Sequence, residues 1–98
     1  MYEYLLPIGS VVKLKNAKKP LMVFGLLQNN PMIPNKSFEY ISVPYPEGHF
    51  DVRLHIGFNH DDIENIIFRG YEDEAQLAFK EMLELSSQID VSNDKTIH

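Results

Sequence analysis

The spacing of apolar residues changes once along the chain, and this change sets the fold class. Before residue 70, short stretches alternate apolar and polar residues, as in Val12–Lys15 and Phe50–Ile56. Alternation of this kind indicates β-strands with one buried face. After residue 70, apolar residues recur every three or four positions, which indicates an amphipathic helix. The sequence therefore predicts an α+β fold in which a small antiparallel sheet precedes a C-terminal helix.

Pro, Gly, Asn and Ser residues divide the first part of the chain into about five predicted strands. We expect these strands near residues 10–15, 20–28, 38–45, 50–58 and 65–69. Five short strands of this kind could close into an SH3-like barrel.

Three local signals refine this sheet. Gly25 lies inside the second predicted strand and indicates a bulge or bend. Gly48 can take the positive φ that closes the turn after Pro46. Asn59 is a good N-cap, and Asp61 favours the first turn of a helix, so the segment NHDD reads as one helical turn.

The predicted helix covers about residues 72–88 and begins with three acidic residues that complement its dipole. Its apolar stripe should pack on the sheet. Leu77 lies on the opposite face beside Glu81 and Glu84, so these three residues are a candidate partner-binding surface. The stripe consists of Ala75, Ala78, Phe79, Met82, Leu85 and Ile89.

A second candidate surface comes from an otherwise polar loop. Met32 and Ile33 are apolar residues at the centre of NNPMIPNKS, where a loop normally carries polar groups. They could fold back on the core or contact a partner. The predicted edge strand FDVRLHI is a third candidate surface for a partner, since a sheet edge can bind an added strand. An exposed edge strand and the loop with Met32 and Ile33 could also form a homodimer.

With 98 residues, the chain is long enough for one domain, which we place at residues 1–89. Residues 90–98 are polar and should form a frayed tail. The chain has no cysteine, so disulfides and thiolate sites are excluded. No segment has the length and apolarity of a membrane span, and the N-terminus lacks a basic leader, so we expect a cytoplasmic protein.

The charge distribution argues against a nucleic-acid partner. The net charge is −5, and all acidic residues except Glu3 follow residue 36. The small lysine group between Lys13 and Lys19 surrounds a predicted turn, whereas nucleic-acid binding requires a clustered basic face.

The sequence contains no recognisable catalytic or metal-binding motif. His60, Asp61 and Asp62 are consecutive and diverge in a helical turn, so only His60 and Glu64 would share a face. A metal-dependent enzyme would need His49 or His55 as a further ligand. We therefore predict no enzymatic activity, no metal and no cofactor, and we keep this metal enzyme as an alternative.

Four separated phrases occur in one order along the chain: LPIGS, YPEG, FNHDDI and GYEDE. With the sequence between them, up to about Leu85, they resemble a family of small proteins from Gram-positive bacteria. Genes of that family lie beside LXG polymorphic toxins in type VII (Esx) secretion clusters. The matched residues that we single out are Pro7, Gly9, Tyr45, Pro46, Glu47, Gly48, Phe58, Asn59, His60, Asp61, Gly70, Tyr71 and Glu72.

The resemblance implies a non-enzymatic cytoplasmic accessory protein, a chaperone or adaptor that binds an LXG-type toxin before export. It transfers no catalytic residue. We interpret the matched residues as turns and caps of the fold, because each phrase contains a residue with a backbone reason to be there. An immunity protein that binds the C-terminal toxic domain through its acidic surface is the alternative in the same setting.

Overall fold

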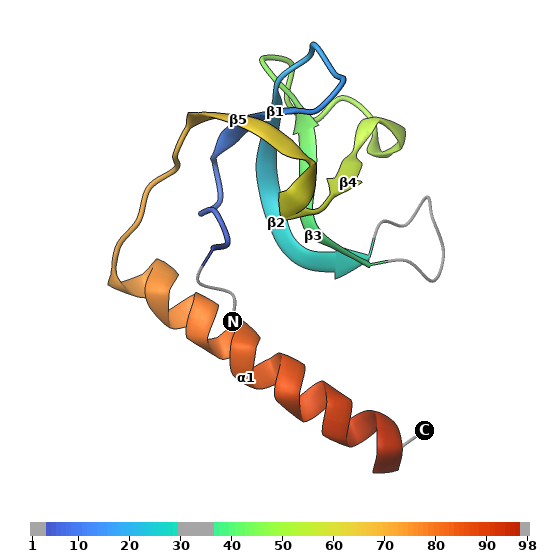
Figure 1. Ribbon diagram of the computed structural model, residues 1–98, viewed down its shortest axis with the longest axis vertical. Helices are drawn as coiled ribbons and strands as arrows, with labels where there is room; N and C mark the ends of the chain where they lie inside the picture. Colours follow the sequence, from blue (N-terminus) through green and yellow to red (C-terminus); the bar gives the residue numbers. More distant parts are fainter. Residues whose placement is uncertain (1–3, 30–36, 97–98) are drawn as a thin grey trace. The chain divides into compact units, whose positions relative to one another are not determined.

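The computed structural model describes residues 4–29 and 37–96, with side chains described for residues 4–27 and 37–85. It has one open antiparallel sheet of five strands in the order β4-β3-β2-β1-β5, and one helix after the sheet (Figure 1). The α+β prediction is therefore confirmed. The elements are β1 Val11–Leu14, β2 Leu21–Asn29, β3 Ser37–Pro44, the 3-10 helix η1 Val52–Leu54, β4 Ile56–Phe58, the 3-10 helix η2 His60–Asp62, β5 Ile63–Phe68 and α1 Glu74–Thr96.

The chain forms two compact units. Leu6–Tyr71 contains the whole sheet, and Glu72–His98 forms a second unit with Met1–Leu5. We describe each unit by itself.

The β1–β2 hairpin forms where the alternating pattern predicts it. Val11 pairs with Met22, and Val12 pairs with Leu21. In the turn, Asn16 takes a φ of 62°, a left-handed conformation that Asn tolerates better than most residues. The Ala17 N–H then donates to the Leu14 carbonyl at 3.2 Å. Local turn chemistry therefore joins these two strands.

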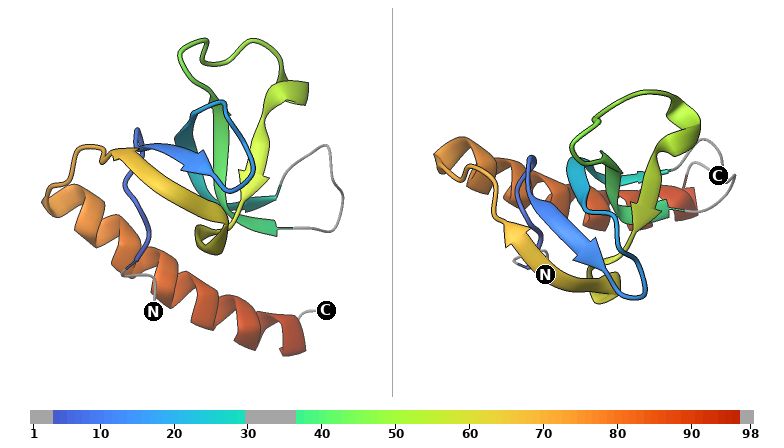
Figure 2. Two further views of the ribbon diagram at one scale, coloured as in Figure 1. Left: turned by 45° about the horizontal axis from the view of Figure 1, so that its top comes forward. Right: turned by 90° about the horizontal axis from the view of Figure 1, so that it is seen from above.

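Strands β2 and β3 form the longest pairing of the sheet, and both bend along their length (Figure 2). The register shifts between Val23 and Gly25, which confirms the predicted irregularity at Gly25. Leu27 takes a φ of 50° in the same strand. The bend therefore coincides with two departures from regular strand geometry.

The last strand returns to the first, so that β5 pairs with β1 although they are far apart in sequence. Val12 pairs with Ile66, and Lys13 forms an ion pair with Glu64. This pairing leaves β4 and β5 as the two edges of the sheet. The sheet is therefore open, and the pairing does not include the closure that an SH3-like barrel would need.

A buried tyrosine organises the core of the sheet unit. The Tyr40 hydroxyl accepts a hydrogen bond from the Leu6 N–H at 3.0 Å, and the Tyr40 ring stacks on Phe58 at 5.0 Å between centroids. Burial raises the pKa of the Tyr40 hydroxyl to about 12, because the phenolate would lose its hydration. The other described apolar residues buried in this unit are Leu6, Pro7, Val11, Val12, Leu21, Val23, Leu26, Ile41 and Val43.

One predicted strand is wrong over most of its length. Residues 50–58 alternate apolar and polar residues, yet only Ile56–Phe58 forms a strand, and Val52–Leu54 is a 3-10 helix. The Asp51 carboxylate caps this helix by accepting from the Arg53 N–H at 2.9 Å. Such side-chain hydrogen bonds to the backbone compete with strand pairing, and the apolar pattern does not reveal them.

Helix α1 begins at Glu74 and extends past the predicted end at Gln88 to Thr96. Asp73 caps its first turn, because the Asp73 carboxylate accepts from the Gln76 N–H at 3.0 Å. The fraying predicted for residues 90–98 and the packing of the apolar stripe on the sheet stay predictions.

Candidate partner-binding surface

Exposed apolar side chains concentrate on the segment that connects β3 to β4. Phe50 is 72% exposed, and Val52, Leu54 and Ile56 are also exposed. Phe24 of β2 is exposed as well, and its ring contacts His55 edge to face at 4.8 Å. We call this set, Phe24, Phe50, Val52, Leu54 and Ile56, the β3–β4 surface. Clustered apolar groups on a soluble domain commonly mark a protein-binding site.

Hydrogen bonds hold the connecting segment in a defined shape. The Leu54 N–H donates to the Asp51 carbonyl at 2.9 Å, and the His55 N–H donates to the Val52 carbonyl at 3.1 Å. At the end of the segment, the buried Ser42 hydroxyl donates to the Ile56 carbonyl at 2.9 Å. The exposed side chains therefore project from an ordered backbone, which lowers the entropy lost on binding.

The charged groups beside the β3–β4 surface are paired within the chain. The Arg53 guanidinium donates to both carboxylate oxygens of Asp51, at 3.0 and 2.7 Å. This hydrogen bonding by the Arg53 side chain, followed by that of the Arg53 N–H, lowers the pKa of Asp51. Lys19 donates to Glu47 at 2.7 Å and likewise lowers the pKa of Glu47. Each acid in these two pairs is matched by one base, so the pairs add no net charge to the surface.

Two histidines complete the segment. His49 Nδ1 lies 2.8 Å from His55 Nε2, which is a hydrogen-bond distance, and their ring centroids are 5.0 Å apart. The sequence placed His55 on the polar face of a strand. In the structure it is half-buried between Phe24 and His49.

His60 occupies a different position from this pair. Its Nδ1 lies 2.7 Å from the Tyr40 hydroxyl, and its N–H donates to the Glu39 carboxylate at 2.8 Å. Because the Leu6 N–H already donates to Tyr40, the Tyr40 hydroxyl can donate its own hydrogen to His60. His60 thus takes part in the hydrogen-bond network around the core tyrosine.

The proposed metal ligands do not gather. In the described part of the chain, no group of three or more His, Asp or Glu residues is arranged to hold a metal ion. His60 contacts Tyr40, whereas His49 contacts His55, and Glu64 forms an ion pair with Lys13. The metal-enzyme alternative therefore gains no support from these side chains.

The helix candidates all lie within α1. Leu77 is 52% exposed, Glu81 is exposed and Glu84 is half-buried. The stripe residues Phe79, Met82 and Leu85 are exposed too, so Leu77 is not distinguished by its exposure alone. Met32 and Ile33 lie outside the described residues.

The residues of the first two family-like phrases occupy turns. The Gly9 N–H donates to the Val23 carbonyl at 2.9 Å with φ at 93°, while the Pro7 carbonyl accepts from the Ser10 hydroxyl at 2.8 Å. The Tyr45–Pro46 peptide bond is cis. Gly48 follows with a φ of 75°, and its N–H donates to the Pro44 carbonyl at 2.7 Å.

The third phrase caps the helical turn that the sequence predicted. Asn59 is the N-cap of η2, as predicted, and its N–H donates to the Asp62 carboxylate at 2.9 Å, while the Asn59 side-chain oxygen accepts from the Glu39 N–H at 3.0 Å. Phe58 is buried against Tyr40, whereas Asp61 is exposed.

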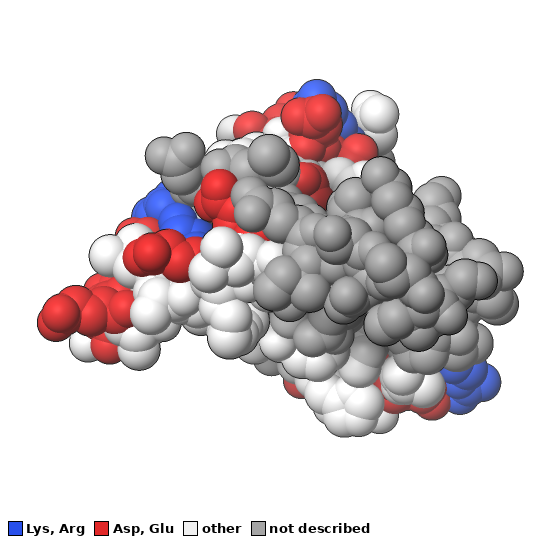
Figure 3. All heavy atoms as spheres, turned by 90° about the horizontal axis from the view of Figure 1, so that it is seen from below, with Lys and Arg blue, Asp and Glu red and all other residues white. Residues whose placement is uncertain are grey.

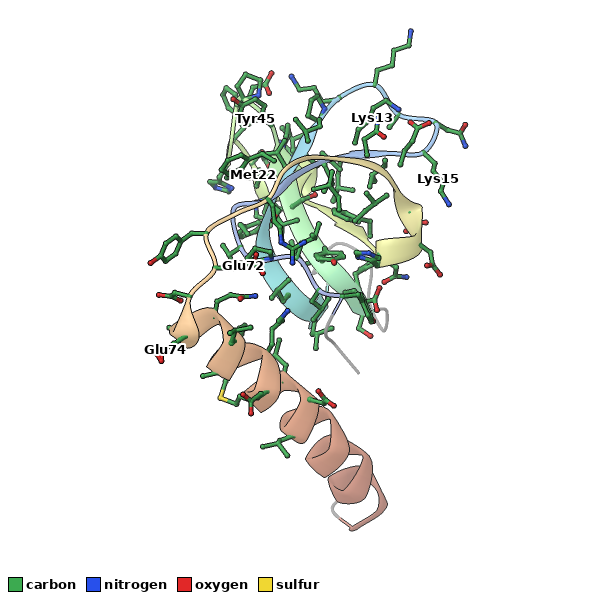
Figure 4. All side chains as sticks on the ribbon, turned by 60° about the vertical axis from the view of Figure 1, so that its left-hand side comes forward. Lys13, Lys15, Met22, Tyr45, Glu72 and Glu74 are labelled. Atoms are coloured by element: carbon green, nitrogen blue, oxygen red, sulfur yellow. The ribbon has the colours of Figure 1, made fainter. Side chains whose placement is uncertain are left out.

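In the fourth phrase, Gly70 approaches the opening turn closely. Its N–H donates to the Ser10 hydroxyl at 3.0 Å. A Cβ at Gly70 would lie only 2.4 Å from the Ile8 carbonyl oxygen. Tyr71 and Glu72 are exposed, and Figure 4 shows Glu72 on the connection before α1 and Glu74 at the start of the helix.

Basic groups do not form a continuous patch on the face in Figure 3. Lysine and arginine atoms of the described residues there are separated by acidic and uncharged atoms. Lys13 lies in β1, and Lys15 directly follows this strand at the start of the hairpin turn (Figure 4). Within the described residues, no helix is long and apolar enough to cross a membrane.

The sequence offered residues 50–56 as a candidate partner-binding edge strand, but it did not predict that their apolar side chains would be exposed. The alternation of Phe50, Val52, Leu54 and Ile56 was interpreted as the buried face of a strand, and the structure exposes all four side chains. The spacing of Asp51 and Arg53 is the signal that could have indicated the capped turn, since Asp favours caps and turns.

The fold and this surface define a small α+β domain built on an open antiparallel sheet. The chain belongs to the family described as domain of unknown function (DUF4176), whose model matches residues 5–79. The match includes the sheet unit and ends within α1, after Phe79. No curated protein and no solved structure matches the chain.

Proposed function

We propose that this protein is a non-enzymatic accessory protein, a chaperone or adaptor, that binds an LXG-type toxin in the cytoplasm before type VII secretion. The toxin as partner comes from the family resemblance of the four phrases. The observation that carries a binding function is the β3–β4 surface, where apolar side chains project from a hydrogen-bonded segment.

The charged pairs beside the β3–β4 surface indicate what kind of toxin surface would bind there. Because Asp51 is paired with Arg53, and Lys19 with Glu47, the complementary surface of the toxin should be apolar and nearly uncharged. Apolar contacts of this kind persist when salt screens electrostatic attraction, since the Debye length falls to about 3 Å at 1 M salt.

Co-expression with the toxin of the same gene neighbourhood tests this function. A non-toxic full-length LXG protein and two truncations, lacking either the N-terminal or the C-terminal domain, are tested for retention of this protein in affinity purification. An adaptor is retained without the toxic domain, and the complex withstands washes at about 1 M salt. Retention that requires the toxic domain and is lost in salt would identify an immunity protein instead.

Surface variants locate the contact. Phe50→Asp combined with Leu54→Asp should abolish retention without unfolding the protein, because both side chains are exposed in the free chain. The matched variant on α1 combines Leu77→Asp with Glu81→Lys and Glu84→Lys, and it should retain the toxin. Loss of binding only in the helix variant would move the site to the face that the sequence predicted.

A further inference from the structure

One hydrogen bond joins the two ends of the segment that carries the β3–β4 surface. His49 Nδ1 and His55 Nε2 lie 2.8 Å apart and belong to residues six positions apart in the sequence. The exposed apolar side chains of Phe50, Val52 and Leu54 lie between them. The other hydrogen bonds described above for this segment span only two or three residues. The histidine pair is therefore the contact that closes the segment.

The two histidines differ in how firmly the sheet holds them. The His55 ring contacts Phe24 of β2 edge to face at 4.8 Å between centroids, and Ile56 begins β4 directly after it. His49 is exposed and follows the turn at Gly48. The hydrogen bond thus fixes the start of the segment to a histidine that two strands position.

A hydrogen bond between two imidazoles requires that one of them is neutral. A neutral imidazole has one donor and one acceptor nitrogen, whereas an imidazolium has two donors and no acceptor. When the pair holds one extra proton, the imidazolium still donates to its neutral neighbour. When both rings are protonated, two N–H groups and two positive charges face each other, and the hydrogen bond is lost.

The charged groups near the pair do not compensate a second positive charge. The pKa of the Asp51 carboxyl is lowered mainly by Arg53 and, to a lesser extent, by the charges of both histidines, so Asp51 interacts with the pair. The Asp51 charge is already matched by Arg53, and the Glu47 charge by Lys19. Strands β2 and β4, on either side of His55 in its contacts, contain no charged residue. Repulsion within a doubly protonated pair therefore stays uncompensated by these neighbours.

We infer that the His49–His55 hydrogen bond is a pH-sensitive latch, which keeps the β3–β4 surface ordered and opens when both imidazoles are protonated. Histidines take up protons between about pH 5 and 8, so the latch is closed above this range and open at its acidic end. In the open form, Phe50 and Leu54 lose their fixed position relative to the sheet. A partner would have to order them again, which lowers its affinity. This effect on binding rests on the proposed function, whereas the latch itself is a property of the free chain.

Backbone order parameters of the free chain, measured by NMR at about pH 7.5 and about pH 5, test the latch. A buffer with EDTA ensures that no metal ion bridges the rings. In the wild type, the order parameters of the residue 52–54 amides should fall from about 0.85 to below about 0.6 on acidification. The hairpin turn at Ala17, whose hydrogen bond to Leu14 involves no histidine, is the internal control and should not change. Unchanged order parameters of residues 52–54 in acid would overturn the inference.

Two replacements of the exposed His49 separate protonation from other effects of acid. His49→Ala removes the hydrogen bond, so residues 52–54 should have low order parameters at both pH values. His49→Asn places an amide oxygen near the position of Nδ1, where it can accept from His55 in either protonation state, so the order parameters should stay high at both pH values. A His49→Ala protein as ordered as the wild type at neutral pH, or a His49→Asn protein that loses order in acid as the wild type does, would also overturn the latch.

Retention of the toxin distinguishes failure of the latch from failure of the proposed function. In affinity purification with the non-toxic LXG protein, the wild type should be retained several-fold less at about pH 5 than at about pH 7.5, whereas His49→Asn should be retained equally at both. Retention that does not follow the order parameters, in a chain whose latch opens as described, would count against the β3–β4 surface as the toxin site and leave the latch standing.

Discussion

Replacement of the buried core tyrosine by phenylalanine should destabilise the sheet unit. The Tyr40 hydroxyl accepts from the Leu6 N–H, and Leu6 is only 1% exposed, so water cannot replace the lost acceptor. An unsatisfied buried donor costs about 1–3 kcal/mol. The lost hydrogen bond to His60 adds about 0.5–1.5 kcal/mol, because half-buried His60 can partly rehydrate. Tyr40→Phe should therefore lower the free energy of unfolding by about 2–4 kcal/mol.

The same substitution should also remove the part of the pH dependence of stability that the ionisation of Tyr40 causes. The unfolded chain releases the Tyr40 proton near pH 10.0, whereas the folded chain retains it up to about pH 12. The folded state therefore binds more protons between these values, and stability falls as pH rises through this window. The Tyr40 proton contributes its full share to the free energy of unfolding below pH 10. About 1.4 kcal/mol of this contribution is lost between pH 10 and pH 11. The difference in free energy of unfolding between the wild type and Tyr40→Phe should therefore be smaller at pH 11 than at pH 7 by about 1.4 kcal/mol.

Urea unfolding at pH 7 and pH 11, followed by the methyl NMR signals of Val12 and Val23, measures both effects in the sheet core. Tyr71→Phe is the matched control, because Tyr71 is 79% exposed and its replacement should change stability by less than about 0.5 kcal/mol. A Tyr40→Phe protein as stable as this control, or a gap that stays constant from pH 7 to pH 11, would refute the reasoning.

Three further substitutions follow from the local geometry. Gly70→Ala should destabilise the sheet unit by about 1–3 kcal/mol in urea unfolding, because its Cβ would lie 2.4 Å from the Ile8 carbonyl oxygen; unchanged stability would contradict this contact. Gly57→Ala would place a Cβ 2.3 Å from the Phe38 ring, so amide hydrogen exchange in β4 should become faster, and an unchanged exchange rate would count against the predicted clash. Arg53→Gln should raise the pKa of Asp51 toward its ordinary value of 3.8 in an NMR carboxyl titration; an unmoved midpoint would show that Arg53 does not cause the lowered pKa.

The local part of the fold could be predicted from the sequence. The hairpin around Asn16, the irregularity at Gly25, the capped turn after Asn59 and the start of α1 all appear near their predicted positions. These features depend on the backbone preferences and hydrogen bonds of residues a few positions apart, which sequence patterns record directly.

The candidate site could not be predicted in the same way. Alternating apolar residues mark either a buried strand or an exposed turn, and the two differ only in whether a neighbouring element covers them. The Asp51 carboxylate caps residues 52–54 as a 3-10 helix instead of a strand, and Phe50 just before this helix is 72% exposed. Apolar pattern alone therefore placed the surface residues in the core.

By itself, the sequence determined the fold class, the order of the strands and helix, and most turns, because periodicity and turn chemistry are local. Only the tertiary structure decided that β5 returns to β1, that Tyr40 accepts from Leu6, and that Gly70 contacts the opening turn. These contacts join residues 34 or more positions apart. They form only when the whole sheet assembles, since each depends on where other strands hold its partner.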